Sequence, residues 1–198
     1  ILALNHLQPA FQSGGNLSLI SNGSISGDAH FTSGGLFAIR NLAGGPGNFL
    51  SLYDPIILST SDVVFGDYTG ASLKVVAAGS ITGGNITILN PEILTPAIAA
   101  DPDATVLTTT NVHIFAGVPE IPFNPAGPTL PGNITVGSLN TTAGGGGPVR
   151  LVAPGNITVN GTIDTSANQF PTAISGSVTI NAGGNILVTD RITTAASS

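Results

Sequence analysis

Two carboxylates that lie close together in the sequence could form a catalytic acid pair. Asp62 and Asp67 could meet across Phe65 and Gly66. Glycoside hydrolysis needs two such carboxylates about 5 to 9.5 Å apart. The chain has 10 acidic residues, however, and the others are scattered, as expected of acids that cap turns and maintain solubility. We favour the second interpretation and predict no catalytic residue and no enzymatic activity.

A few further residues have the chemistry of ligands or bases. Asp101 and Asp103 flank a proline and could offer oxygen atoms to Ca²⁺, but that ion takes six to eight oxygens and nothing nearby in sequence completes the set. His6, His30 and His113 are isolated from any serine and acid that would complete a catalytic triad. We therefore predict no metal site and no cofactor.

A turn asparagine followed two positions later by Ser or Thr recurs along the chain. The residues are Asn16, Asn22, Asn85, Asn133, Asn140, Asn156 and Asn160. In a eukaryotic secreted chain this pattern marks glycan acceptors. Asparagine beside glycine also tolerates tight turns and bonds to nearby backbone. We interpret the pattern as a turn residue that precedes a short alternating strand.

An internal repeat indicates which strands and turns carry these residues. Val149–Thr165 (VRLVAPGNITVNGTIDT) aligns without a gap with Val178–Thr194 (VTINAGGNILVTDRITT) at an offset of 29 residues, and Leu73–Ile81 is a third, partial copy. The matched apolar pairs are Val149/Val178, Leu151/Ile180, Ile157/Ile186, Val159/Val188 and Ile163/Ile192. Repeats of this length are typical of solenoids. We predict an all-β chain that forms one right-handed parallel β-helix of about seven to nine coils, with the matched side chains inward and in register.

One region interrupts the repeat. The segment 90–131 holds 8 of the 14 prolines, and proline cannot donate a hydrogen bond to a β-ladder. We predict that this segment is an excursion from a single β-solenoid spanning 1–198, and that Val112–Phe115 returns to the solenoid as one strand. The excursion is the predicted partner contact, and its candidate residues are Pro119, Pro122, Phe123 and Pro125.

Composition excludes several classes of function. The chain has 4 basic and 10 acidic residues, a formal net charge of -6, and no cysteine. A nucleic-acid-binding protein would carry a basic patch, and none is visible. No apolar run approaches the ~20 residues that span a bilayer as a helix. We predict neither nucleic acid as a partner nor a membrane-spanning segment.

Several glycine-rich motifs resemble a known family. They are Gly14–Leu19 (GGNLSL), Gly34–Leu52, Gly66–Lys74 and the GNITV turns. These motifs are similar to those of filamentous-haemagglutinin-like exoproteins, most of all the cyanobacterial kind secreted by the two-partner route. The resemblance implies a long right-handed parallel β-helix, secreted or at the cell surface. It implies no secretion residues here, because the family's Asn-Pro-Asn motif is missing.

Three functions remain open at this point. The first is a structural or adhesive shaft whose partners are neighbouring coils or subunits of the same protein, with cell-surface glycans as a further partner. Such a shaft would belong to a longer protein or stack into filaments, because neither end of the sequence resembles a capping repeat. The second is a β-helix that binds or cleaves carbohydrate. The third is an ice or crystal binder, which would need regular threonine ladders that the sequence lacks.

Overall fold

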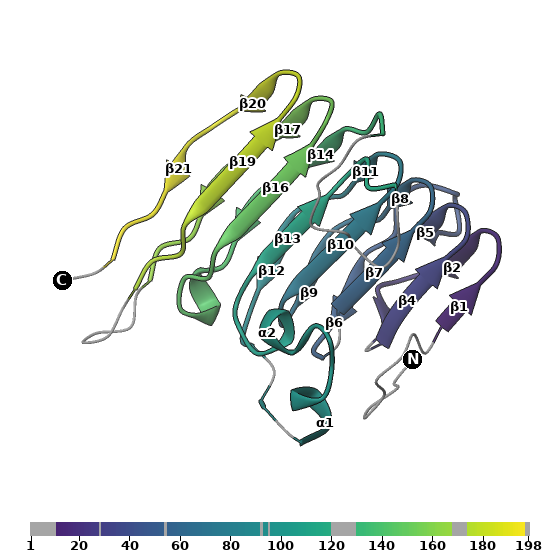
Figure 1. The fold of residues 1–198 in the computed structure, drawn as a ribbon, viewed down its shortest axis with the longest axis horizontal. Helices are drawn as coiled ribbons and strands as arrows, with labels where there is room; N and C mark the ends of the chain where they lie inside the picture. The colour runs from purple at the N-terminus through teal and green to yellow at the C-terminus, as the bar shows by residue number, and fades with distance from the viewer. Residues whose placement is uncertain are drawn as a thin grey trace.

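The computed structural model describes residues 11–27, 29–53, 55–91, 93–94, 96–119, 130–167 and 174–196. These residues form a parallel β-helix with three sheets of seven strands each (Figure 1). Each coil contributes one strand to each sheet, so the described residues form seven coils, as the repeat predicts. The first strand, β1, and the last coil, β19 to β21, lie at opposite ends of the stack.

The strands are two to five residues long and pair only with the coils before and after them. The first sheet contains β1 (Phe11–Ser13), β4 (Ala29–Ser33), β7 (Pro55–Ser59), β10 (Leu73–Ala77), β13 (Val112–Phe115), β16 (Val149–Ala153) and β19 (Val178–Ala182). The second sheet contains β2 (Leu17–Ser21), β5 (Phe37–Asn41), β8 (Val63–Val64), β11 (Ile81–Thr82), β14 (Ile134–Val136), β17 (Ile157–Val159) and β20 (Ile186–Val188). The third sheet contains β3 (Ile25–Ser26), β6 (Phe49–Ser51), β9 (Tyr68–Gly70), β12 (Ile86–Ile88), β15 (Leu139–Asn140), β18 (Ile163–Asp164) and β21 (Ile192–Thr193).

The register of the last two coils is the one that the repeat predicts. Val149 pairs with Val178, Ile157 with Ile186 and Ile163 with Ile192, all in parallel strands. The members on the sixth coil are fully buried. Their partners on the seventh coil continue the same columns but are partly exposed, because no further described coil covers them.

The core consists of inward side chains stacked along the axis, and its composition changes along the stack. Aromatic rings fill the first coils: the Phe31 ring centroid lies 5.5 Å from that of Phe11 and 5.9 Å from that of Phe49, which lies 5.6 Å from that of Tyr68. The buried Tyr68 hydroxyl donates to the Ser72 carbonyl (2.7 Å). Valine, isoleucine and leucine fill the later coils. Since each coil covers its neighbour's apolar face, the short strands gain a continuous core that none could form alone.

The excursion contains more regular structure than a loop. After β12 the chain forms two four-residue helices, α1 (Pro96–Ala99) and α2 (Ala104–Leu107), before β13 joins the first sheet. A short 3-10 helix, Thr142–Gly144, follows β15. The strand expected at Val112–Phe115 is confirmed.

Candidate functional site

The outer face of the first sheet gathers most of the chain's basic side chains into one column. His30, Ile56, Lys74, His113 and Arg150 occupy the same register position on five successive strands. Alternate residues of a strand point to opposite faces, and their neighbours at the adjacent positions fill the core. Two of the four Lys and Arg residues therefore share one line on an otherwise acidic protein.

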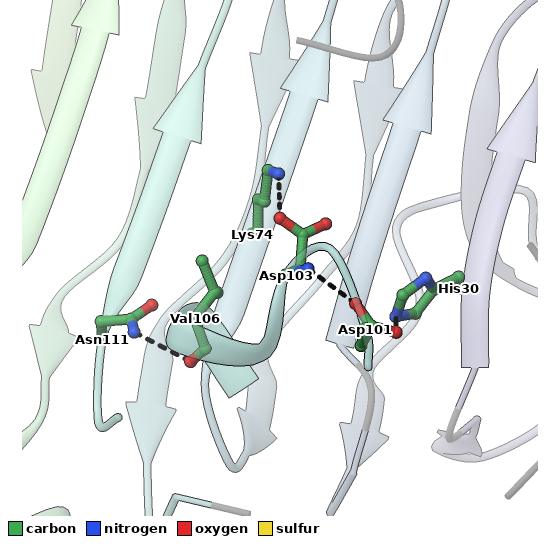
Figure 2. Close-up of polar contacts among 6 residues, drawn as sticks. All are labelled: His30, Lys74, Asp101, Asp103, Val106 and Asn111. Carbon is green, nitrogen blue, oxygen red and sulfur yellow. Dashed lines mark hydrogen bonds and ion pairs between the residues drawn. The ribbon is translucent and has the colours of Figure 1, made fainter. Parts of the chain in front are cut away.

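The excursion packs onto this face through an apolar contact, one ion pair and one contact between an aspartate and a histidine. Ile98 of α1 and Leu107 of α2 form a buried cluster with the outward side chain of Ile56. Beside that cluster, Asp101 and Asp103 lie next to the basic column (Figure 2). The α1–α2 segment thus lies against the β-helix.

Both aspartates have basic partners. Asp101 Oδ2 lies 3.5 Å from His30 Nε2, and Asp103 Oδ1 lies 2.5 Å from Lys74 Nζ. The Asp103 N–H donates to Asp101 Oδ1 (2.7 Å), which closes the turn between the two acids (Figure 2). The Asp103 carboxylate, which is paired with Lys74, is a poor ligand for Ca²⁺. Among the described residues, no three His, Asp or Glu side chains gather as a metal site would require.

At the other end of the column, His113 and Arg150 have no carboxylate partner among the described residues like those of His30 and Lys74; Arg150 lies over an aromatic ring instead. The Arg150 guanidinium carbon lies 5.2 Å from the centroid of the Phe115 ring, a cation–π distance. Burial lowers the pKa of His113 below its ordinary value of 6.5, and the positive charges of Arg150 and Lys74 lower it further, whereas Asp103 raises it. His113 therefore favours its neutral form.

Asp62 and Asp67, the two candidates for an acid pair, each bond within a different turn of the β-helix. Asp62 Oδ1 accepts a hydrogen bond from the Ser80 N–H (2.7 Å), and Asp67 Oδ1 accepts one from the Asn85 N–H (2.8 Å). Each carboxylate thus connects its own coil to the next. The geometry supports the turn interpretation.

These bonds belong to two ladders of side-chain acceptors. The first-turn ladder occupies the residues immediately before the second-sheet strands, namely Asn16, Leu36, Asp62, Ser80, Asn133, Asn156 and Asn185. The second-turn ladder occupies the residues immediately before the third-sheet strands from β6 to β18, namely Asn48, Asp67, Asn85, Ser138 and Thr162. In each ladder a side-chain oxygen accepts a hydrogen bond from the backbone N–H of the equivalent residue on the next coil. Leu36 interrupts the first ladder because it has no side-chain acceptor.

Glycine before a ladder residue makes room for this bond. A Cβ on Gly35 would lie 2.4 Å from Asn16 Oδ1, and one on Gly184 would lie 2.4 Å from Asn156 Oδ1. The same close approach occurs at Gly66, Gly79, Gly84, Gly137 and Gly155. Each Gly-Asn turn therefore takes part in two contacts between coils: its glycine leaves room for the ladder side chain of the coil before, and its asparagine bonds to the coil after. Local turn propensity does not predict this role.

The predicted partner contact is only partly described. Pro119 is exposed, whereas Pro122, Phe123 and Pro125 lie outside the described residues. Val118, just before this segment, packs with Phe115 on the outer face of the first sheet. Just after it, the Leu130 N–H donates to the Gly117 carbonyl (2.9 Å), so the two ends of the segment meet.

Another part of the described surface has an apolar hollow that includes an exposed aromatic ring. The hollow has a volume of about 250 Å³, and its lining includes Leu52, Tyr53, Asn90 and Ile93. Tyr53 is 39% exposed, whereas Tyr68 is part of the core. Of the two tyrosines in the sequence, only Tyr53 is therefore placed to stack on a sugar.

The chain was compared with protein-family models, with curated proteins and with solved structures, and none of the three comparisons found a match. In the part of the chain that the structure describes, no helix has the length and apolar character needed to cross a membrane. The fold and the ladders are therefore the observations on which a functional proposal rests.

Proposed function

We propose that this chain is a structural and adhesive β-helical shaft of a secreted surface protein, of the filamentous-haemagglutinin-like kind that it resembles. The observation that carries the proposal is the use of turn acids and amides as connectors between coils. Asp62 and Asp67 both accept backbone N–H groups of the next coil. Turn side chains that hold successive coils together support a mechanical role.

The side faces suit weak, repeated contacts with other molecules. A solenoid presents an extended surface, and contacts that are individually weak gain strength when several engage at once. The segment 119–129 is the proposed partner contact because it follows β13 in the sequence and holds four prolines among its residues. Cell-surface glycans are the proposed partners.

Carbohydrate binding without adhesion, or carbohydrate cleavage, is the second candidate. The hollow beside Tyr53 favours it, because an exposed ring next to an amide side chain is a common way to hold a sugar. In this reading the chain binds glycans through the third-sheet side rather than through the excursion.

A loop replacement tests the leading proposal. Because the Leu130 N–H bonds to the Gly117 carbonyl, residues 119–129 can be replaced by a short Gly-Ser linker without stretching the backbone. We expect beads coated with this variant to lose most of the cell or glycan binding shown by beads coated with the wild-type chain. The circular-dichroism spectrum of the β-helix should stay unchanged.

Two matched variants separate the alternatives. Tyr53→Ala should leave bead binding unchanged, as should Leu42→Ala, which alters another exposed side chain on a different turn. Loss of binding in Tyr53→Ala alone would favour the hollow as the glycan site. Release of reducing sugar from a polysaccharide, abolished by Asp62→Ala or Asp67→Ala, would refute the proposal and favour an enzyme.

A further inference from the structure

The basic column on the outer face of the first sheet ends in an exposed arginine. Lys74, His113 and Arg150 pair in register on β10, β13 and β16, so their backbones follow one another at about 4.8 Å. The Lys74 ammonium is bonded to the Asp103 carboxylate (Figure 2). Arg150 lies two strands beyond this pair and is exposed, and among the described residues its guanidinium has no carboxylate partner. The column therefore presents its positive charge to solvent at Arg150.

An aromatic ring holds the Arg150 guanidinium in place. The central carbon of the guanidinium lies 5.2 Å from the centroid of the Phe115 ring. That ring is 4% exposed and packs with Val76 and Val152 in an apolar cluster on the same face, so it forms a fixed support. A cation–π contact uses no N–H group, so the five N–H donors of the arginine side chain remain available to an acceptor from outside.

The groups beside Arg150 are neutral and polar. Arg150 pairs with His113 on one side and with Thr179 on the other. Asn181, two residues after Thr179 on β19, faces the same side of the sheet. Because burial lowers its pKa, His113 favours its neutral form, in which the imidazole has one N–H donor and one acceptor nitrogen. The arginine is thus flanked by an imidazole, a hydroxyl and a carboxamide, each of which can bond to a sugar hydroxyl.

We propose that Arg150 binds the carboxylate of a uronic-acid polysaccharide, with His113, Thr179 and Asn181 bonding to the hydroxyls beside that carboxylate. The planar guanidinium can donate two parallel hydrogen bonds to the two carboxylate oxygens. A uronic acid carries its carboxylate and its hydroxyls on one ring, which matches a cation flanked by neutral polar groups. The inference rests on the proposed function for the class of partner, a glycan, and assigns to that glycan a charge and a site away from the segment 119–129.

The partner is a polymer because the site is open. A single exposed ion pair contributes little to binding, so a free monomeric acid should bind weakly. A polysaccharide repeats its carboxylate along the chain and can engage several copies of the protein at once, which raises the overall affinity.

Binding of labelled polygalacturonate to beads coated with the chain tests the site. At low ionic strength, wild-type beads should bind polygalacturonate and should not bind dextran, a neutral polysaccharide. Arg150→Gln should weaken binding at least about fivefold, and Arg150→Lys should recover little of it, because lysine carries the charge without the fork. Arg191→Gln removes the same charge from another exposed arginine, so it is the matched control and should bind like the wild type. All variants should keep the circular-dichroism spectrum of the wild type.

The imidazole supplies a second measurement. Burial lowers the pKa of His113, the positive charges of Arg150 and Lys74 lower it further, and Asp103 raises it. A carboxylate bound at Arg150 offsets part of that positive charge, so a high concentration of oligogalacturonate should raise the pKa of His113 measured by NMR in the full chain. Arg150→Gln should abolish this response. A purely structural role of Arg150 would leave the pKa independent of the ligand.

Four results would overturn the inference. The first is equal binding of polygalacturonate by the wild type and Arg150→Gln, and the second is full recovery in Arg150→Lys. The third is binding of dextran sulfate without binding of polygalacturonate, which would make the ligand a sulfate. The fourth is equal binding of polyglutamate, which would make the partner an acidic peptide.

The replacement of residues 119–129 separates this inference from the proposed function. That variant should lose cell binding and keep polygalacturonate binding. Loss of polygalacturonate binding in that variant, with Arg150→Gln unaffected, would place the acidic glycan on the excursion and overturn the inference. Wild-type beads that bind cells but no polygalacturonate would refute the inference and leave the proposed function intact.

Discussion

The same substitution at two positions of one core column should have very different effects on stability. Ile157 and Ile186 are paired in register in the second sheet, but Ile157 is fully buried and Ile186 is 51% exposed. Replacing each by alanine removes the same atoms from the same column. The difference between the two variants therefore isolates the contribution of burial by a neighbouring coil.

The magnitudes follow from the exposures. Isoleucine to alanine removes three carbons from the core, a transfer term of about 2.4 kcal/mol at about 0.8 kcal/mol each. At Ile157 a cavity term adds to this, because Ile134 and Ile186 flank the site and cannot collapse fully, so the expected loss is about 3 to 4 kcal/mol. At Ile186 half of the transfer term is already lost to solvent and no closed cavity forms, so the expected loss is about 1 kcal/mol.

Urea unfolding followed by circular dichroism at 218 nm measures the free energy of unfolding lost in each variant. Amide hydrogen exchange within β14 and β17 shows where the β-helix opens. The measurement is made at low protein concentration, so that contacts between molecules contribute nothing to the burial of Ile186. Equal losses at low concentration would refute the reasoning, because they would mean that the last coil is covered in the monomer.

Three further outcomes are expected. Asn156→Ala should destabilise the chain by about 1 kcal/mol through loss of a ladder bond, whereas Asn160→Ala should change the free energy of unfolding by less than half of that. Asp103→Asn should weaken the ion pair with Lys74 and speed proteolysis of residues 96–111, while the melting temperature of the β-helix hardly moves, because partly exposed pairs contribute little. Because burial lowers the pKa of His113 in the folded chain, the unfolded chain binds more protons below pH 6.5; stability should fall as pH drops from 6.5 toward the folded pKa, and His113→Gln should flatten that slope in pH-dependent denaturation.

The repeat predicts the architecture because, in a solenoid, equivalent positions of successive sequence repeats pair in adjacent strands. The alignment of the two sequence copies matches Ile157 with Ile186 and Ile163 with Ile192, and the structure pairs the same residues in adjacent strands. The partial copy at Leu73–Ile81 was also placed correctly, since Leu73 pairs with Val112, which pairs with Val149. Regular turns and apolar alternation carried this information.

The contacts of the excursion could not be predicted in the same way. The helices α1 and α2 are four residues each, too short for a helical period to appear in the sequence. The contact between His30 and Asp101 joins residues that are far apart in the chain and that no local pattern relates. The recurring Gly-Asn turns show the ladder positions in the sequence. The hydrogen bonds of the ladders could not be predicted from these turns alone, because each bond depends on which coil packs on which.

The two longest ladder spacings have a consequence for how the chain folds. Ser80 bonds to the Asn133 N–H and Asn85 bonds to the Ser138 N–H across 53 residues, against 18 for the bonds one coil earlier. Closing the longer loop costs about 1 kcal/mol more in chain entropy, since the cost grows with the logarithm of loop length. We expect this coil boundary to form late and to open early. The molecule should then fold from two nuclei, one on each side of the excursion, that join when β14 docks on β11.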